Sequence, residues 1–229
     1  MEKQVEYYYE KLEEIKKRDQ TDFIKIHINN KTIILRAIDD SDSTVKLLTK
    51  CRLAYRNWFG SDFKISELKT IEWIRNGIMN NIDRSLFIIF FQEQKIGCIG
   101  TIRYNKEKNS AALDAMMKDP DFEFPKLMEI VEKVFLRWMF EKLKIVKITG
   151  YLFQDNHKMM HVHKNCGWKK VNEIPLKLVK TKEGTRWEEM EKSQNNPERF
   201  FDEIEITYKN LMQNFGNIEY EFLDNELSV

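Results

Sequence analysis

The chain has 229 residues, of which 42% are hydrophobic, and a formal net charge of +1. This length and apolar content allow one domain with a full hydrophobic core. The balanced charge excludes a general electrostatic attraction to nucleic acid or to an anionic membrane. The N-terminal segment is charged, unlike a signal peptide, and the longest apolar run, residues 86–91, is far shorter than the ~20 residues of a membrane span. Cys51, Cys98 and Cys166 follow no disulfide spacing, so we expect a cytoplasmic protein.

The N-terminal part predicts a charged helix, a hairpin and two further helices. Residues 2–19 carry an apolar stripe at helical spacing, which favours an accessory helix packed on a larger body. The stripe consists of Val5, Tyr8, Leu12 and Ile15. Residues 23–38 then alternate around Asn29 and Asn30, which tolerate the positive φ of a hairpin turn. Residues 39–59 and 66–79 follow as two helices, with Ser66 as the cap of the second.

The middle of the chain predicts three antiparallel strands and a buried helix. Residues 86–92, 95–103 and 110–117 are rich in apolar residues and are joined by short polar turns. Pro125 suits the first turn of the next helix, and apolar residues recur through it at helical spacing. Residues 144–153 form a strand, Asp155 or Asn156 caps another helix, and Gly167 ends it.

The remaining elements complete an α+β fold. Residues 168–190 predict a closing hairpin around 182–185, and residues 197–215 predict a helix. We therefore expect one mixed, mostly antiparallel sheet flanked by helices, with extra helices at both ends. The expected organisation is an accessory helix over residues 1–20, a central domain over 21–190 and a C-terminal helical extension over 191–229.

Three of the four histidines lie in one segment, residues 151–171, which raises the question of a metal site. His157 and His161 share one face of a helix, as a zinc pair requires, but the glutamate of a metalloprotease helix is missing between them. His163 is rotated by roughly 200° from His161. We therefore expect no metal. Cys166 is expected to fill space beneath the helix end, since a nucleophilic role would require a partner base and a lowered thiol pKa.

The same segment resembles a known family. "DNHKMMHVHKNCGW" resembles the last motif of the GNAT N-acyltransferase superfamily, N-x-x-A-x-x-x-Y-x-K-x-G-F, with His163 at the tyrosine position and Asn165 at the lysine position. Residues 95–117 resemble the family's central strands, and residues 127–153 its main helix and following strand, so the resemblance covers residues ~33 to 190. Four fragments, 51–74, 112–128, 152–156 and 174–189, are similar to acyltransferases that modify the amine of nucleotide-linked amino sugars for surface glycans.

The resemblance implies a binding site for acetyl-CoA. The family binds the pyrophosphate with a glycine-rich loop at a helix N-terminus, whereas "KDPDFEFPKLM" contains no glycine. We expect an altered phosphate loop, with loss of the site as the alternative. The residues expected to hold the carrier, mainly through their backbone, are Met116, Met117, Lys118, Lys126, Leu127, Met128 and Asn156; the two methionines at 116 and 117 also suit core packing.

The resemblance also implies catalytic and acceptor-binding residues. His163 would give a proton to the departing thiolate, or would merely pack near the carrier. Asp114 would accept the proton of the attacking amine, or would face solvent. Arg52, Arg56 and Trp58 would bind a diphosphate and a base or sugar, although core packing explains Trp58 equally well.

The function expected from these residues is transfer of an acetyl group from acetyl-CoA to a primary amine, with a nucleotide-linked amino sugar as the favoured acceptor. The alternatives are an amine of a protein N-terminus, an amino acid or another small molecule, or a GNAT-like binding module without catalysis. No nucleic acid, membrane or metal partner is expected, and a homodimer is compatible with the sequence.

Overall fold

The computed structural model describes residues 2–17, 21–182, 184–191 and 196–223. The expected domain limits at residues 1, 20 and 229 lie outside the described residues. The α-helices of the described part are α1 Glu2–Lys17, α2 Asp42–Ala54, α3 Glu67–Ile74, α4 Leu127–Lys142, α5 His157–Cys166 and α6 Tyr208–Asn214. The strands are β1 Asp22–Ile28, β2 Lys31–Ala37, β3 Ser61–Asp62, β4 Arg84–Phe91, β5 Gln94–Asn105, β6 Ser110–Lys118, β7 Lys147–Phe153, β8 Lys169–Thr181, β9 Gly184–Glu189, β10 Arg199–Thr207 and β11 Glu219–Phe222.

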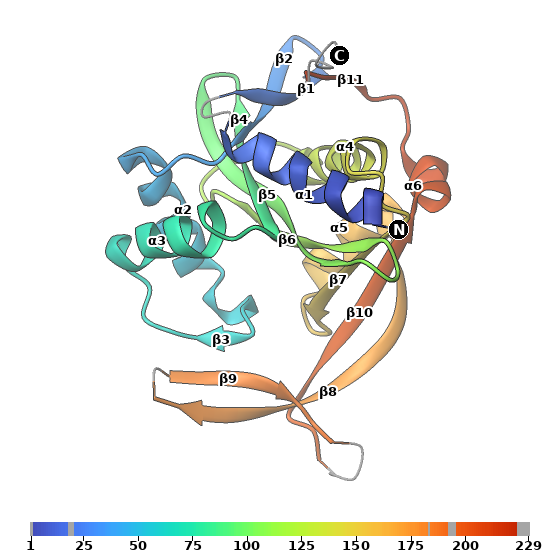
Figure 1. Cartoon of the computed structure of the whole chain (residues 1–229). Coiled ribbons are helices and arrows are strands. Elements are labelled where there is room, and N and C mark those ends of the chain that lie inside the picture. Colours follow the sequence, from blue (N-terminus) through green and yellow to red (C-terminus); the bar gives the residue numbers. More distant parts are fainter. Residues whose placement is uncertain (1, 18–20, 183, 192–195, 224–229) are drawn as a thin grey trace.

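These strands form one sheet in the order β11-β1-β2-β4-β5-β6-β7-β10-β8-β9-β3 (Figure 1). All pairings are antiparallel except that of β6 with β7. The predicted α+β class with a mostly antiparallel sheet is therefore confirmed. Strand β4 lies in the interior of the sheet, which explains why its apolar run is buried on both faces.

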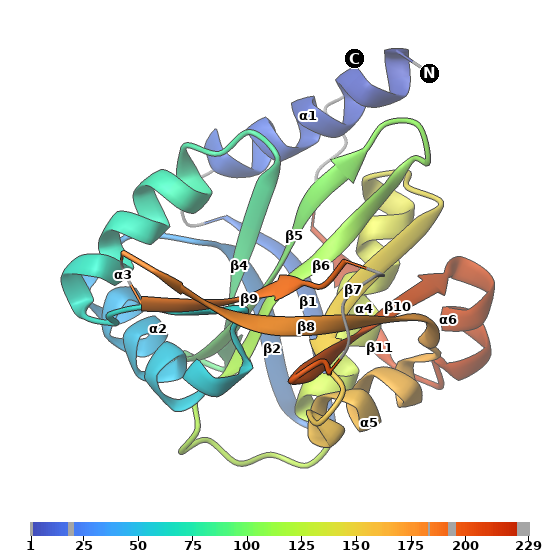
Figure 2. The ribbon, with the colours of Figure 1, turned by 90° about the horizontal axis from the view of Figure 1, so that it is seen from below.

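Helices cover both faces of the sheet. The main core cluster joins α1, α4 and α6 to one face, and a second cluster joins α2 and α3 to the other. Figure 2 shows α2 and α3 on one side of the central strands and α4, α5 and α6 on the other. Helix α1 docks through Tyr8, which is fully buried and stacks on Tyr104 with ring centroids 4.0 Å apart. The two faces thus carry separate core clusters.

Local sequence signals placed most helix ends correctly. Ser66 caps α3, Asn156 caps α5, and Gly167 follows α5 with a φ of 101°, as predicted. Helix α4 differs, because Pro125 lies outside it and the helix begins at Leu127.

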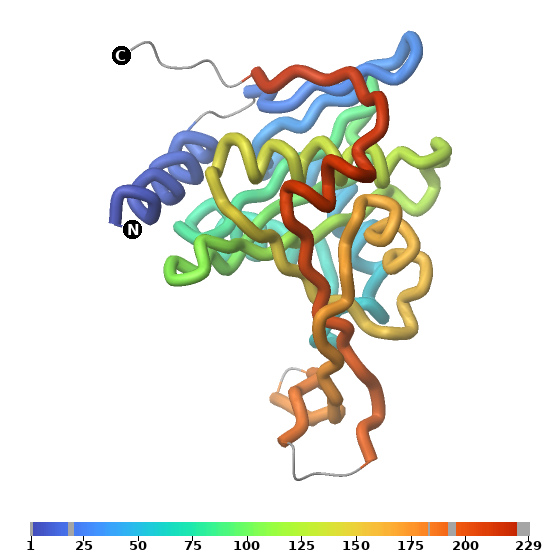
Figure 3. The backbone as a smooth tube through the Cα atoms, turned by 90° about the vertical axis from the view of Figure 1, so that its right-hand side faces the viewer, coloured from blue at the N-terminus to red at the C-terminus, as the bar shows by residue number. Residues whose placement is uncertain are grey.

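The helix predicted over residues 197–215 is wrong. Residues 199–207 form strand β10, and only residues 208–214 are helical. Asp202, Ile204 and Ile206 are buried while Glu203 and Glu205 between them are not, which is the two-residue period of a strand. Strand β10 pairs with β7 on one side and β8 on the other, so residues 199–207 belong to the central sheet rather than to a helical extension (Figure 3).

Candidate active site

The sheet opens between β6 and β7. These parallel strands pair only through residues 110–112 of β6 and 147–149 of β7 in the described structure. Beyond this point β7 continues beside β10 as far as Phe153, while β6 continues beside β5 as far as Lys118. The second halves of β6 and β7 therefore do not pair with each other, and we call this interruption of the ladder the gap.

Strand β6 carries a bulge at this gap. Cys98 pairs with Met117 and Gly100 with Asp114, so Ala115 and Met116 have no partner in the register of β5. Ala115 has a φ of 45°, the left-handed conformation that allows the extra residue to fit. The bulge turns part of the backbone of β6 out of the ladder, beside the gap.

The loop after β6 leads to an unusual helix start. Ser41, Ser66, Asn156 and Thr207 cap α2, α3, α5 and α6 through their side chains, whereas no side chain caps α4. The residue at the cap position of α4, Lys126, has a φ of 58°. A lysine therefore adopts the left-handed conformation that glycine commonly supplies. In the first turn of α4 the amide of Leu127 donates to the carbonyl of Phe124 at 3.4 Å, whereas the amide of Met128 remains available to an anion.

Lysines gather at the same end of the gap. Burial and the nearby charge of Lys158 on α5 lower the pKa of Lys118 at the end of β6. Two positive charges that repel each other in this way are stabilised by a bound anion.

Half-buried apolar side chains belong to the elements on the α4 side of the sheet. They pack against the main core while keeping part of their surface exposed, and they come from β6, α4 and α5: Leu113, Met116, Met128, Met159 and Met160. Methionine adapts its shape to a flexible ligand. We refer to this surface as the apolar crevice.

His163 lies at the interface between α4 and α5. Its Nδ1 atom is 2.6 Å from Oε1 of Glu132, a fully buried residue of α4. The indole Nε1 of Trp168 donates to the same oxygen at 2.7 Å, and Glu132 Oε2 has no partner among the described residues. Burial and the neighbouring Glu132 raise the pKa of the Cys166 thiol, so the sulfur is disfavoured as a nucleophile.

Asp114 lies on the opposite face, toward α2 and α3. Its Oδ2 atom accepts a hydrogen bond from Nε of Arg84 at 2.6 Å, and both side chains are mostly buried. Arg84 and Arg52 stack on Trp73, with guanidinium carbons 5.2 Å and 4.7 Å from the ring centroid. Arg52 donates to Thr70, and burial together with the charge of Arg84 lowers the pKa of Arg52 to about 10.

The loop between α2 and α3 meets the β8–β9 hairpin. Strand β3 of this loop pairs with β9, and the hairpin runs across the underside of the molecule (Figure 2). Arg199 of β10 joins the two parts, since it binds the carbonyl of Asn57 and lies against the rings of Trp58 in the loop and Trp187 on β9. It also binds Asp155. Its guanidinium carbon is also 3.4 Å from the Phe153 ring centroid. We call these contacts the Arg199 clasp.

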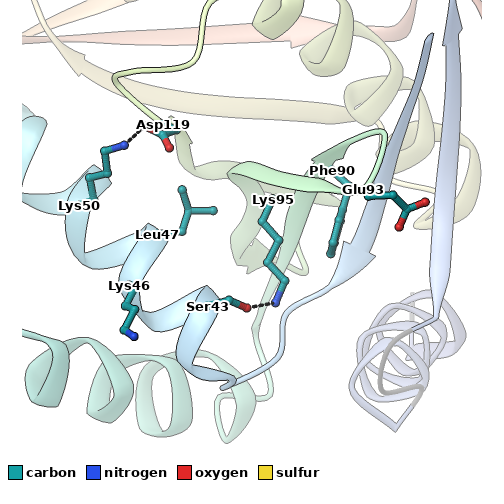
Figure 4. A pocket seen from close by; sticks show the side chains of 8 residues that line it. All are labelled: Ser43, Lys46, Leu47, Lys50, Phe90, Glu93, Lys95 and Asp119. Carbon is teal, nitrogen blue, oxygen red and sulfur yellow. Dashed lines mark hydrogen bonds and ion pairs between the residues drawn. The ribbon is translucent and has the colours of Figure 1, made fainter.

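A cavity lies on the α2 side of the sheet. It has a volume of about 470 Å³, lies between α2 and the β4–β5 turn and is lined in part by Lys46, Lys50 and Lys95 (Figure 4). Lys50 and Lys95 already bind Asp119 and Asp39 respectively. In the described part of the chain, no three His, Cys, Asp or Glu side chains form a group that could hold a metal ion, and no helix is long and apolar enough to cross a membrane.

Comparison with known proteins identifies the family of the chain. The model of the acetyltransferase (GNAT) domain matches residues 32–169, which is more than half of the chain. The chain belongs to the GNAT acetyltransferase family. It is therefore an N-acetyltransferase. No curated protein matches the sequence.

Solved structures similar to this acetyltransferase share its fold. A spermidine N-acetyltransferase from Vibrio cholerae, in complex with CoA and spermine, has a TM-score of 0.62 and 15% identity over 79% of this chain and 98% of that chain. A probable acetyltransferase of the GNAT family from Chromobacterium violaceum has a TM-score of 0.58 and 13% identity over 80% of this chain and 85% of its own. An acetyltransferase from T. thermophilus has the same TM-score and identity over 83% of this chain and 93% of its own.

The acetyltransferase distributes its predicted site residues over both faces of the sheet. Met116, the start of α4 at Leu127 and Met128, Asn156 and His163 lie on the α4–α5 face, with Lys118 and Lys126 at its loop end, whereas Met117 packs with α2 and α3. Asp114 and Arg52 lie on the α2–α3 face. Arg56 is exposed and binds Asp62, and Trp58 is 38% exposed beside the clasp.

Four residues of this acetyltransferase were not singled out from the sequence: Trp73, Arg84, Ala115 and Glu132. Glu132 carried a detectable signal, because it occupies the apolar stripe of α4 between Met128 and Phe135. A charge at such a position requires a partner. The positions of the other three residues in the site result from contacts between distant segments, which residue spacing along the chain cannot predict.

Proposed function

We propose that this acetyltransferase transfers an acetyl group from acetyl-CoA to a primary amine, and that the amine belongs to a nucleotide-linked amino sugar. The opening between β6 and β7, with the bulge at Ala115, is the observation that carries the reaction. The donor reaches the opening from the α4–α5 face and the acceptor from the α2–α3 face.

The residues of the α4–α5 face fit the carrier. The uncapped first turn of α4, with the backbone amide of Met128, suits a diphosphate, and Lys118 and Lys126 add positive charge. Asn156, which caps α5, lies beside β7 and suits the amides of the pantetheine arm. The thioester of acetyl-CoA would supply the activated acyl group.

The bulge and two side chains would perform the transfer. The backbone around Met116 would donate to the carbonyl oxygen, where one fixed N–H lowers the barrier by about 3 kcal/mol. The backbone of Met117 continues this edge of the strand. Asp114 would take a proton from the amine, held in place by Arg84, and His163 would give one to the departing sulfur.

The charge of the acceptor face favours an anionic acceptor over a polyamine. The carboxylates of Asp114, Asp62 and Asp155 are each paired with an arginine. Arg52 has no carboxylate partner among the described residues, so it adds positive charge. Together with the exposed ring of Trp58, it suits a diphosphate and a stacked base or sugar.

Calorimetry with acetyl-CoA tests the donor site. Lys126→Glu should weaken binding at least ~10-fold, because it places a negative charge beside the diphosphate. Lys108→Glu, in the β5–β6 turn, is the matched control and should bind like the parent. No heat with the parent, or equal affinity of the Lys126 variant, contradicts the donor site.

A thiol-release assay over a panel of amines tests the acceptor. Nucleotide-linked amino sugars should give the highest kcat/KM among a set that includes spermidine, amino acids, aminoglycosides and peptides with a free N-terminus. Highest activity with spermidine would replace the proposed acceptor by a polyamine. Binding of acetyl-CoA without turnover of any amine would indicate a module without catalysis.

A further inference from the structure

We propose that Glu132 is a positioning residue for acetyl transfer, which holds His163 through Nδ1 and so directs Nε2 to the departing sulfur. This inference rests on the proposed function, in which His163 supplies the proton. It adds a residue that the GNAT motif does not contain, on a different helix from the motif itself.

The geometry fixes one tautomer of the imidazole. A carboxylate 2.6 Å from Nδ1 accepts a hydrogen bond, so Nδ1 carries a proton. Trp168 donates to the same oxygen, which holds the carboxylate in place from a third segment of the chain. Carboxylate, imidazole and indole are thus arranged so that the ring of His163 has little freedom to turn.

The other ring nitrogen remains accessible. Among the described residues, Nε2 of His163 has no hydrogen-bond partner, and it is absent from the buried atoms that lack one. The 9% of the side chain that stays exposed therefore includes this atom. Met159, one turn earlier on the same face of α5, is part of the apolar crevice. Nε2 is thus the atom of His163 available to a ligand in the crevice.

Packing alone does not explain why a glutamate occupies position 132. The stripe that Glu132 interrupts is otherwise apolar, and a buried carboxylate is unfavourable unless its oxygens are paired. Here one oxygen accepts two hydrogen bonds and the other has no partner in the described structure. A well-packed apolar residue is often neutral or stabilising at such a position, so the contacts of this carboxylate with His163 and Trp168 are its distinguishing feature.

Glu132 and His163, which we call the dyad, together support the transfer of one proton to the departing sulfur. As the amine forms the new C–N bond and the C–S bond breaks, His163 gives the Nε2 proton to the sulfur and keeps the electron pair. Glu132 stabilises the doubly protonated ring before this step, and the neutral ring afterwards keeps its Nδ1 proton. His163 then regains a proton from solvent.

Kinetics of Glu132→Gln test the proposal. Glutamine keeps the size and one acceptor but removes the charge, so kcat should fall ~10- to 100-fold while both KM values stay within about 2-fold. His163→Phe should lose at least as much, and the double variant should be no slower than His163→Phe, because the two residues act as one unit. Trp168→Phe, which leaves the carboxylate beside the imidazole, should lose less than Glu132→Gln.

Three outcomes overturn the inference. If Glu132→Gln keeps the parent kcat while His163→Phe is slow, Glu132 has no part in the reaction, but the proposed function stands. Additive losses in the double variant indicate a separate structural role. Parent kcat in His163→Phe removes the dyad from the reaction, while donor binding and turnover still test the acetyltransferase itself. Should Glu132→Gln fail to fold, ¹⁵N resonances of the parent decide, since an unprotonated Nδ1 contradicts the geometry.

Discussion

Asp114 lies on β6 beside the opening in the sheet. It binds Arg84, which stacks with Arg52 on Trp73. Asp114→Asn keeps the shape of the side chain but removes the proposed base, so we expect kcat to fall ~10²- to 10⁴-fold. Donor affinity should stay unchanged, because Asp114 and the apolar crevice lie on opposite faces. Steady-state kinetics and calorimetry measure the two effects. Asp62→Asn, which also removes a carboxylate from an arginine, is the control, and equal losses in both variants would exclude a catalytic role for Asp114.

Lys126 combines a strained backbone with a useful charge. Lys126→Gly should raise the free energy of unfolding by up to about 1 kcal/mol, because glycine adopts positive φ without strain. The same change should weaken acetyl-CoA binding, since it removes a cation. Lys144→Gly is a matched control, with a φ of 55° after α4, and should stabilise without altering affinity. Chemical unfolding and calorimetry compare the two, and unchanged affinity in the Lys126 variant would assign the lysine to the fold alone.

At the scale of elements, the bulge in β6 depends on glycine in β5. A Cβ atom at Gly97 would lie 2.3 Å from the carbonyl oxygen of Met117. Gly97→Ala should therefore destabilise the protein by ~1–3 kcal/mol and lower kcat, because β6 has to shift at the opening. Gly60→Ala, whose Cβ meets only a side-chain atom at 3.7 Å, should be close to neutral in thermal unfolding and activity. Parent activity in Gly97→Ala would show that the bulge position does not matter.

The start of α2 gives the protein a specific sensitivity to acid. Burial alone would raise the pKa of Asp39, but hydrogen bonds from Ser41, Thr44 and Lys95 lower it to about 2. The folded state therefore holds this proton less tightly than the unfolded state, and the stability gained above pH ~4 is lost as the pH falls toward 2. Between pH 6 and pH 2 the free energy of unfolding of Asp39→Asn should therefore fall by about 1–2 kcal/mol less than that of the parent. Asp42→Asn should keep it, and identical profiles for the parent and Asp39→Asn would contradict the assignment.

For the whole molecule, the Arg199 clasp ties the β8–β9 hairpin to the α2–α3 loop. Arg199→Met keeps an unbranched chain against Phe153 but loses the bonds to Asp155 and Asn57. We expect faster hydrogen exchange in both segments and a ~5- to 20-fold higher KM for the amine, with the KM for acetyl-CoA unchanged. Arg186→Met, on β9, removes an exposed arginine and should have neither effect. A change in the KM for acetyl-CoA alone would place the clasp outside the acceptor site.

How far the sequence could predict this molecule depends on the range of the interactions. Ser66, Asn156 and Gly167 act within one turn of a helix, and their roles were predicted correctly. The apolar residues of β10 fit both a helical and a strand period over a short segment, and only its place between β7 and β8 decides. The contacts of Glu132 with His163 and of Asp114 with Arg84 join residues about 30 positions apart, beyond the reach of a local pattern.

The insertion of β10 also bears on how the protein is made. As the polypeptide leaves the ribosome, β7 and β8 emerge before the segment that separates them. Until residues 199–207 arrive, both strands offer unsatisfied edges to one another and to neighbouring nascent chains. Translation that stalls before this point would therefore yield a species inclined to aggregate, and a chaperone that shields β-edges would be most useful in this interval.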